Sequence, residues 1–146
     1  MVNLKKKKIQ LFFLSVVSLT ILLDQLTKYL IYKFNPQLDL GLLMIHFIKN
    51  TGAGFGILSS QIYLLAFISL VVSLVMILIY PKVPKKYLPQ FFYALFLGGV
   101  MGNLLDRLFR RFVIDFLDFI YWPTFNLADM AISIAALGLI IYFWRE

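Results

Sequence analysis

The chain contains no cysteine and only one histidine, His46. Without cysteine it has no disulfides, no thiol nucleophile and no thiolate ligands for a metal. One histidine is too few for a histidine-based zinc site and leaves little for a Ser-His-Asp triad. His46 lies in the apolar run 43–48, so we expect it to be structural. We therefore expect no metal and no cofactor, and the remaining chemistry is that of carboxylates.

Charged residues are scarce as well. Of the 146 residues, 14% are charged and 62% are hydrophobic, and the mean hydropathy is +0.88. Soluble proteins carry about 25% charged residues, so this composition indicates an integral membrane protein. The basic residues lie in blocks at 5–8, 82–86 and 107–111. Such blocks beside apolar segments are typical of topology signals, and we expect no nucleic-acid partner.

Four apolar segments are long enough to cross a bilayer, which takes about 20 residues. We predict an all-α integral membrane protein with transmembrane helices at approximately 9–32, 62–80, 89–108 and 127–144, in one domain spanning 1–146. A cleaved signal peptide is the alternative for the first segment. That segment has no small-residue cleavage pattern, which favours a helix.

The residues between the first two helices, approximately 34–61, do not have a helical pattern. They include Asn35 and Pro36, and later the glycine-rich stretch 50–56. We predict a strand at 43–48, with glycines supplying turns or close backbone approach. The result would be a small external β-rich segment that lies at the membrane surface, because it is too apolar to be freely solvated.

Basic residues set the expected orientation. The lysines at 5–8 and 82–86 place both termini, and the loop between the second and third helices, in the cytoplasm. Arg107, Arg110 and Arg111 argue against this orientation. It brings five polar residues that are distant in the sequence to the external side, where we expect them to converge. They are Asp24, Asn50, Asp106, Asp115 and Asp129.

Acidic residues are few and concentrated. The chain has six aspartates and one glutamate, and four of the aspartates lie within residues 98–129. Ionisable residues are costly in a membrane and often mark function. Two close carboxylates share one proton, so the ionised one can activate water while the protonated one donates to a carbonyl oxygen. Such a pair needs no metal, cysteine or histidine.

Asp129 is a candidate member of such a pair. Asn126 is a natural N-cap for the last helix, which places Asp129 in the first turn, where the helix dipole favours its charge. A simple capping acid is the alternative role. The spacing leaves the partner of Asp129 open among Asp106, Asp115 and Asp118.

Three further patterns accompany the aspartates. Asp24 and Lys28 are four residues apart and share a helix face as a favourable pair; an interfacial pair with a snorkelling lysine is the alternative. The glycines within 98–102 form a small-residue face for close helix packing. We expect Arg107 to hold Asp106 ionised in a bidentate pair, which would make Asp106 structural.

Five motifs are spread over most of the chain. They are DQLTK (24–28), NTGAGF (50–55), GGVMGNLLDR (98–107), VIDF (113–116) and FNLAD (125–129). In this order they resemble the motifs of lipoprotein signal peptidases (signal peptidase II). The resemblance implies a multi-pass aspartyl endopeptidase of the bacterial cytoplasmic (inner) membrane, with an external β-rich cradle and its active site at the external face. It would remove the signal peptide from a prolipoprotein, cleaving before the diacylglyceryl-modified cysteine.

The resemblance also implies roles for particular residues. Asp115 and Asp129 match the family's catalytic aspartates, which selects Asp115 as the partner that spacing leaves open. The supporting and substrate-binding positions match Asp24, Lys28, Asn50, Gly52, Asn103, Asp106, Arg107, Asn126 and Ala128. The implied partners are a diacylglyceryl-modified prolipoprotein and membrane lipids, and we expect a monomer.

The chain departs from the family's pattern in two places. Arg111 stands where members commonly have glycine, and the loop at 117–124 is short. Both departures concern local loop geometry and substrate selectivity rather than the reaction. Asp118 is an extra acid, which we expect on the loop surface.

Two other functions compete with this one. A small four-helix proton-coupled transporter would use Asp24 and the polar cluster at 102–107 as a pathway, and would place ionisable residues nearer the membrane midplane. The acids here lie at one end instead. A non-catalytic membrane scaffold subunit would pack through its glycine faces, and its aspartates would be replaceable.

Overall fold

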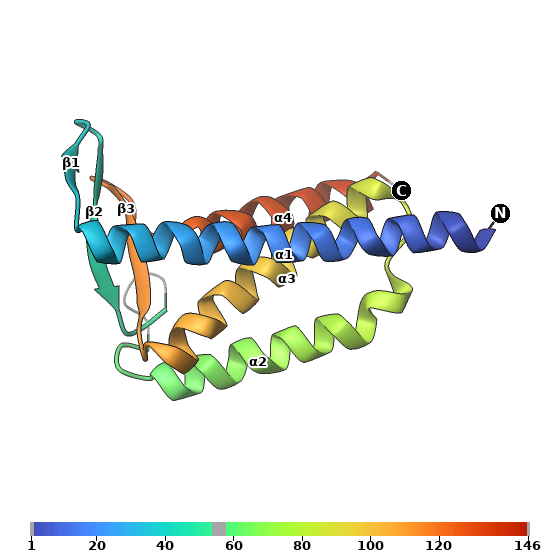
Figure 1. Ribbon diagram of the computed structural model, residues 1–146, viewed down its shortest axis with the longest axis horizontal. Helices are drawn as coiled ribbons and strands as arrows, with labels where there is room; N and C mark the ends of the chain where they lie inside the picture. Colours follow the sequence, from blue (N-terminus) through green and yellow to red (C-terminus); the bar gives the residue numbers. More distant parts are fainter. Residues whose placement is uncertain (1, 54–57, 146) are drawn as a thin grey trace.

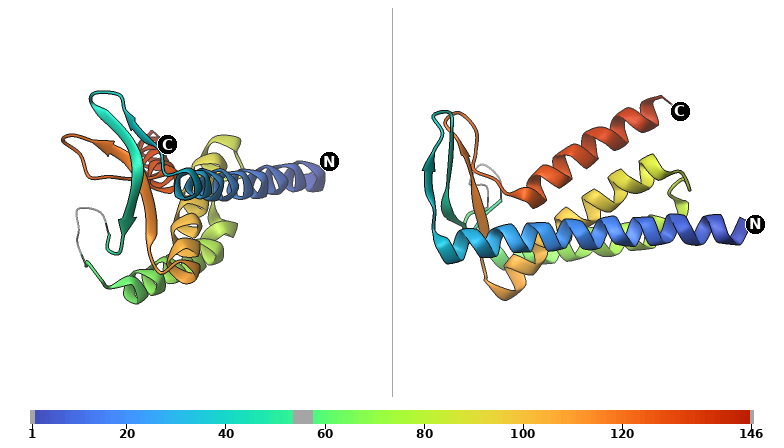
Figure 2. Two further views of the ribbon diagram at one scale, coloured as in Figure 1. Left: turned by 60° about the vertical axis from the view of Figure 1, so that its left-hand side comes forward. Right: turned by 45° about the horizontal axis from the view of Figure 1, so that its top comes forward.

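The computed structural model describes residues 2–53 and 58–145 (Figures 1 and 2). Within these residues it has four long helices, a three-stranded sheet and a short 3-10 helix. The helices are α1 (Val2–Phe34), α2 (Ile62–Ile79), α3 (Tyr87–Phe109) and α4 (Leu127–Trp144). The strands are β1 (Gln37–Asp39), β2 (Leu43–Asn50) and β3 (Val113–Phe119), and the 3-10 helix is η2 (Tyr80–Lys82).

Within the described ranges, all four long helices are long and apolar enough to span a membrane. Three of them lie close to their predicted bounds. The exception is α1, which begins at Val2 rather than near residue 9 because the lysine block at 5–8 continues the helix. Its 33 residues measure about 50 Å at about 1.5 Å per residue. The helix is therefore longer than a hydrocarbon core of about 30 Å.

The helices are apolar outside and polar inside. Large apolar side chains such as those of Leu22, Phe67 and Leu137 are mostly exposed, whereas the charged side chains of Asp24 and Lys28 are fully buried. This arrangement suits a bundle surrounded by lipid, because an ionised group facing hydrocarbon is costly.

Helix α3 packs against each of the other three long helices. Small residues permit the close approach: a Cβ atom on Gly99 would lie 2.6 Å from the carbonyl oxygen of Ala128 in α4. A Cβ on Gly102 would lie 2.6 Å from Asp24 Oδ2 of α1. The small-residue packing face predicted for this helix is confirmed.

The sheet has the strand order β1-β2-β3, with antiparallel pairs, and lies at one end of the helices (Figure 1). The predicted strand at 43–48 corresponds to β2. Strand β3 is absent from the sequence prediction, which has only a loop between the last two helices. Its two aspartates suggest a loop, but its first four residues are buried, and Ile114 and Phe116 pack with Ile31 of α1. Asp118 therefore lies in a strand, and the prediction of a loop-surface acid is wrong.

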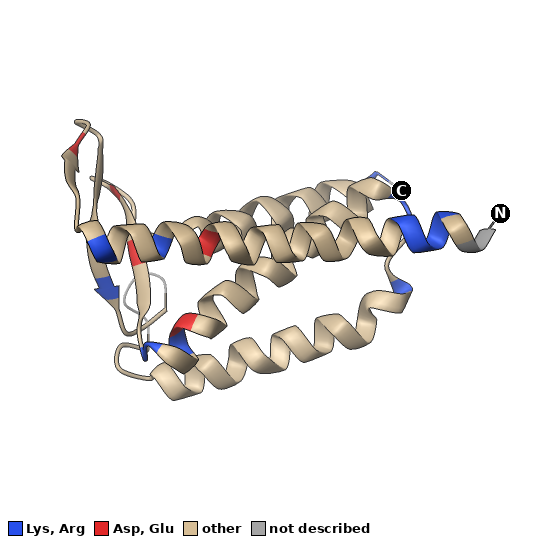
Figure 3. Ribbon diagram, viewed as in Figure 1, with Lys and Arg blue, Asp and Glu red and all other residues tan. Residues whose placement is uncertain are grey.

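Charge is distributed unevenly along the molecule. Both ends of the chain lie at the end opposite the sheet, together with the lysines at the start of α1 and after α2 (Figures 1 and 3). The described aspartates lie in the half nearer the sheet (Figure 3). The two termini thus share one end, and the polar residues predicted to converge lie toward the other.

Candidate active site

Asp115 lies within β3 and is 1% exposed. Asn50 of β2 donates from Nδ2 to Asp115 Oδ2 at 2.8 Å. Asn126, which precedes α4, donates from Nδ2 to Asp115 Oδ1 at 2.6 Å. Each oxygen of this carboxylate therefore has its own amide donor, and the two donors come from different segments of the chain.

Asp129 lies in the first turn of α4. Asn126 is the N-cap, as predicted: its side chain accepts from Asp129 N at 3.0 Å, and Asn126 N donates to Asp129 Oδ2 at 3.3 Å. This reciprocal capping box fixes the start of the helix. The other oxygen, Oδ1, accepts from Asn103 Nδ2 of α3 at 2.8 Å. Asp129 is thus both a capping acid and part of a polar cluster.

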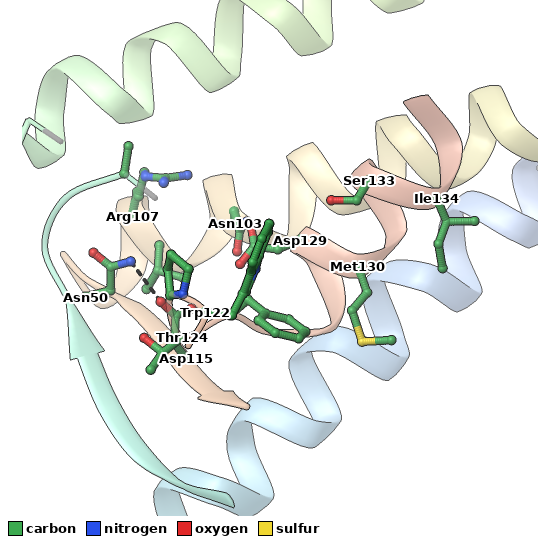
Figure 4. A pocket seen from close by; sticks show the side chains of 14 residues that line it. Asn50, Asn103, Arg107, Asp115, Trp122, Thr124, Asp129, Met130, Ser133 and Ile134 are labelled. Carbon is green, nitrogen blue, oxygen red and sulfur yellow. Dashed lines mark hydrogen bonds between the residues drawn. The ribbon is translucent and has the colours of Figure 1, made fainter. Parts of the chain in front are cut away.

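Asp115 and Asp129 line the same cavity, which has a volume of about 510 Å³ (Figure 4). Among the described residues that line it, neither Asp106 nor Asp118 occurs, so Asp115 is the candidate partner that shares the cavity with Asp129. The rest of the lining is Asn50, Ala53, Asn103, Arg107, Val113, Trp122, Pro123, Thr124, Phe125, Met130, Ser133 and Ile134. A largely apolar cavity with a few convergent polar groups is typical of a substrate site.

The ionisation of Asp115 depends on Asp129. Burial, and secondly the charge of Asp129, raise the pKa of Asp115 to about 6. Hydrogen bonds from Asn50 and Asn126 and the charge of Lys28 lower this pKa but do not cancel the rise. A carboxyl group with a pKa near neutrality can both give and take a proton at physiological pH. The cavity therefore holds a carboxylate pair suited to general acid–base chemistry.

Comparison with known proteins covers nearly the whole chain. The family described as "Signal peptidase (SPase) II" matches residues 16–145. The chain belongs to this family. It is 38% identical over 136 residues to the lipoprotein signal peptidase of Halothermothrix orenii, covering 90% of this chain and 94% of that protein. It is 37% identical over 139 residues to the lipoprotein signal peptidase of Moorella thermoacetica, covering 91% of each.

Two solved structures are similar to this signal peptidase II family member. Both are described as bacterial membrane enzymes studied by the in meso method, at 2.3 Å and 1.9 Å resolution. The first has a TM-score of 0.84 and 25% identity, covering 91% of this chain and 87% of the other. The second has a TM-score of 0.82 and 25% identity, covering 92% and 93%. The resemblance seen in the five motifs is confirmed, and the transporter and scaffold alternatives are not favoured.

A buried lysine supports the site in this signal peptidase II family member. Lys28 of α1 is 0% exposed and donates to Asp24 Oδ2 at 2.8 Å and to Asn103 Oδ1 at 2.9 Å. It also forms an ion pair with Asp106 Oδ2 at 2.9 Å. Burial excludes the snorkelling alternative. Because Asn103 accepts through Oδ1, its Nδ2 is left to donate to Asp129.

Asp24 connects α1 to the start of α4. Its Oδ1 accepts from Ala128 N at 3.0 Å. This amide belongs to the first turn of α4, where N–H groups lack intrahelical partners and negative charge is favoured. A Cβ on Gly102 would come 3.5 Å from the Cβ of Ala128 as well as close to Asp24. Small residues at both positions therefore let the buried carboxylate reach the helix start.

The prediction that Arg107 pairs with Asp106 is wrong. Asp106 pairs with Arg110, as well as with Lys28. Residues four apart share a helix face, whereas adjacent residues point about 100° apart. Arg107 instead lines the cavity and donates from Nη1 to Ser69 Oγ of α2 at 3.3 Å. Its buried Nε has no hydrogen-bond partner within the described part of the chain. The i, i+4 spacing of Asp106 and Arg110 is the signal that sequence reasoning missed.

Gly52 belongs to the turn that orients Asn50. Gly52 N donates to Asn50 Oδ1 at 2.8 Å. This turn occupies the amide oxygen and leaves Nδ2 free to donate to Asp115. The remainder of this glycine-rich motif, residues 54–56, lies outside the described residues. Gly52 is thus a supporting residue that acts through Asn50.

Arg111 has a left-handed backbone, with a φ of 62°. It follows the C-cap of α3, and its N donates to the carbonyl oxygen of Asp106 at 3.1 Å. Left-handed residues that end helices are usually glycine, which lacks the Cβ that makes this conformation costly. Arg111 therefore adopts a conformation that glycine would adopt without this cost.

The segment 117–124 includes the end of β3 and a short loop, after which Phe125 pairs back with Leu117 of β3. Phe125 N donates to the carbonyl oxygen of Leu117, and Leu117 N donates to that of Phe125, both at 3.0 Å. The next residue, Asn126, is thereby held where it can donate to Asp115. The short loop is thus part of how the site is built.

Proposed function

We propose that this chain is a membrane aspartyl endopeptidase that removes the signal peptide from lipid-modified bacterial prolipoproteins, with Asp115 and Asp129 as its catalytic residues. Cleavage occurs before the diacylglyceryl-modified cysteine. The observation that carries the proposal is one largely apolar cavity lined by both aspartates, in which burial and then the charge of Asp129 raise the pKa of Asp115. Membership of the signal peptidase II family supports both the reaction and the substrate.

The reaction begins with one proton shared by the two carboxyl groups. The ionised carboxylate takes a proton from water as the water oxygen attacks the scissile carbonyl carbon, and the protonated carboxyl donates to the carbonyl oxygen. Collapse of the tetrahedral intermediate then breaks the C–N bond. The amine of the modified cysteine leaves with a proton from one carboxyl, and the other regains a proton from the intermediate. The pair again holds a single proton.

The surrounding polar residues position this pair. Asn50, Asn103 and Asn126 donate to the two carboxylates, so each side chain is held in one orientation. Lys28 fixes the amide of Asn103 by donating to its Oδ1. Arg107 lines the cavity wall, where a cationic side chain suits a role in substrate binding.

The site would face the exterior, with both termini in the cytoplasm of a bacterium. Lysines at the end opposite the sheet support this orientation by the positive-inside rule (Figure 3). A signal peptide is itself an apolar helix, and its modified cysteine carries acyl chains, so enzyme and substrate share the bilayer. Met130 and Ile134 in the cavity wall offer apolar contacts to such a substrate. The proposed functional unit is a monomer.

The experiment that tests this proposal uses two forms of one substrate. The purified full chain in detergent is incubated with a preprolipoprotein carrying the diacylglyceryl group and, separately, with the same precursor lacking it. We expect release of the signal peptide from the lipidated precursor alone, with the modified cysteine as the new N-terminus by mass spectrometry. Failure of the folded chain to cleave the lipidated precursor would refute the proposal.

A further inference from the structure

One histidine–aspartate pair in the sheet plays no part in the site described above. His46 Nε2 of β2 lies 3.0 Å from Asp118 Oδ2 of β3, and the two side chains are 25% and 26% exposed. The chain's one histidine and its extra aspartate therefore bond to each other across two strands. Asp118 is three residues from Asp115 on the same strand, so the two side chains point to opposite faces of the sheet.

The two strands change register beside this pair. Residues 44–45 of β2 pair with residues 117–118 of β3, whereas residues 48–50 pair with residues 113–115. Residues 46–47 of β2 therefore oppose one residue of β3. This is a β-bulge, a feature that re-aims side chains and is common next to active sites.

The bulge decides on which face of the sheet Asn50 points. Paired residues of antiparallel strands share a face, and successive residues alternate between faces. With the bulge, Ile48 is opposite Asp115, and Asn50 lies on the same face as Asp115. If the pairing of residues 44–45 continued without a bulge, Asn50 would be opposite residue 112 and would point to the other face. It could not then donate to Asp115, a bond of 2.8 Å in this structure.

We propose that His46 and Asp118 are positioning residues that hold the bulge in place and thereby keep Asn50 on the face of Asp115. His46 is the first of the two bulged residues, and its bond to Asp118 fixes the register of the strand up to that point. The extra residue must then fall before Ile48. This inference rests on the proposed function, because its consequence is for catalysis by Asp115.

The backbone alone specifies this register weakly. A pair of antiparallel strands can exchange one set of backbone hydrogen bonds for another by slipping one residue, so side-chain pairs decide between registers. A hydrogen bond to a carboxylate is among the stronger pairs available. At the tip of the sheet, the bond from Ile120 N to the carbonyl oxygen of Leu42 is long, at 3.4 Å. The His46–Asp118 pair therefore adds a side-chain restraint to the backbone pairing at this end.

The neighbouring charged groups have other contacts. Asp39 of β1 accepts from Gly41 N at 2.8 Å. Lys49 of β2 lies 4.8 Å from the ring centroid of Phe112. Neither contact joins β2 to β3 at the bulge, so neither would replace the His46–Asp118 bond.

The first test compares two substitutions of similar size. Asp118→Asn retains an oxygen that accepts from His46, whereas Asp118→Leu does not. We expect Asp118→Leu to lower kcat by about tenfold to a hundredfold, as displacement of a catalytic group does, with KM little changed. We expect Asp118→Asn, and the control Asp39→Leu on β1, to stay near wild type. If Asp118→Leu does not fold, His46→Leu and His46→Gln form the equivalent comparison.

Two readouts separate positioning from a general loss of stability. The double variant Asn50→Ala/Asp118→Leu should have a kcat no lower than that of Asn50→Ala alone. The contact from Asn50 to Asp115 is already lost in Asp118→Leu, so removing Asn50 has no further effect. The hydrogen bond from Asn50 lowers the pKa of Asp115, against the opposing charge of Asp129 and alongside that of Lys28. The pKa of Asp115 in the pH profile of kcat/KM should therefore rise in Asp118→Leu, as in Asn50→Ala.

A folded Asp118→Leu protein with wild-type kcat would overturn the positioning role and leave the proposed function standing. If the free-energy losses calculated from kcat for Asn50→Ala and Asp118→Leu were fully additive in the double variant, the positioning role would be overturned as well. Absence of cleavage by the wild-type chain is a different result, which removes the proposed function and this inference together.

Discussion

Four charged side chains form a network of ion pairs next to the residues that line the cavity. Lys28 and Arg110 are positive, and Asp24 and Asp106 are negative. All but Arg110 are fully buried. When a buried charge loses its partner, no water can take the partner's place. Removing one member of a buried group of charges is therefore far more destabilising than breaking a surface ion pair. Stability and the geometry of the site therefore depend on the same residues.

Replacing Lys28 with methionine should show this dependence. The substitution keeps the length of the side chain but removes the cation that Asp24 and Asp106 share, so we expect a loss of about 3–5 kcal/mol in the free energy of unfolding. Denaturant unfolding in detergent measures it. The matched control is Lys33→Met at the exposed end of α1, which should change stability by less than about 0.5 kcal/mol. Equal effects at the two positions would contradict the account of the buried group.

The raised pKa of Asp115 predicts a particular pH dependence of stability. Its pKa is about 6 in the folded protein against 3.8 ordinarily, so the folded state binds more protons between these values. Stability should therefore fall as pH rises through this window, and this group should add no further fall above it. Asp115→Asn should remove the fall. Unfolding midpoints between about pH 4 and pH 7 test this, and identical pH dependence in the two proteins would disprove the raised pKa.

At the scale of elements, the helices could be predicted from the sequence and β3 could not. A long apolar run has one stable conformation in a bilayer, the helix, because only a helix satisfies its own backbone. A strand such as β3 depends on a partner far away in the sequence, and burial at its start hides the alternation that marks an exposed sheet. The wrong partner for Asp106 has a different cause: its i, i+4 spacing to Arg110 is visible in the sequence, but the prediction chose the adjacent Arg107.

The end of α3 offers a test of the backbone. Arg111 adopts a left-handed conformation that glycine reaches without strain. Arg111→Gly should therefore raise stability by up to about 1 kcal/mol, whereas Arg111→Val should lower it because a β-branched residue is disfavoured at positive φ. Thermal unfolding midpoints of the two variants should move in opposite directions. A lower midpoint for Arg111→Gly would contradict the strain at this position.

The contact between α1 and α3 gives a further prediction. A Cβ at position 102 would lie 2.6 Å from Asp24 Oδ2, so Gly102→Ala should destabilise the protein by about 1–3 kcal/mol through overpacking. It should also reduce cleavage, because Asp24 holds the first turn of α4 through Ala128 N. Leu108→Ala, on an exposed face of α3, is the control and should affect cleavage little. Wild-type cleavage by Gly102→Ala would show that Asp24 need not be held so closely.

At the scale of the whole molecule, the site is assembled from segments spread over the chain. The sequence predicts their convergence, because helices of similar length that cross one membrane bring their corresponding ends together. It does not predict the hydrogen bonds among them, since those depend on helix rotation and strand register. The partner of Asp129 was open for this reason until the family resemblance selected Asp115. In the structure the two line one cavity.

The central claim is that Asp115 and Asp129 together activate water. Its most direct test is single-turnover cleavage of a diacylglyceryl-modified preprolipoprotein by Asp115→Asn, Asp129→Asn and Asp106→Asn, each first shown to be folded. We expect no detectable cleavage by the first two, because an amide cannot accept the proton of water or donate as an acid. Asp106→Asn, which alters only the supporting network, should retain measurable cleavage. Normal turnover by Asp115→Asn, with none by Asp106→Asn, would show that the pair is wrongly assigned.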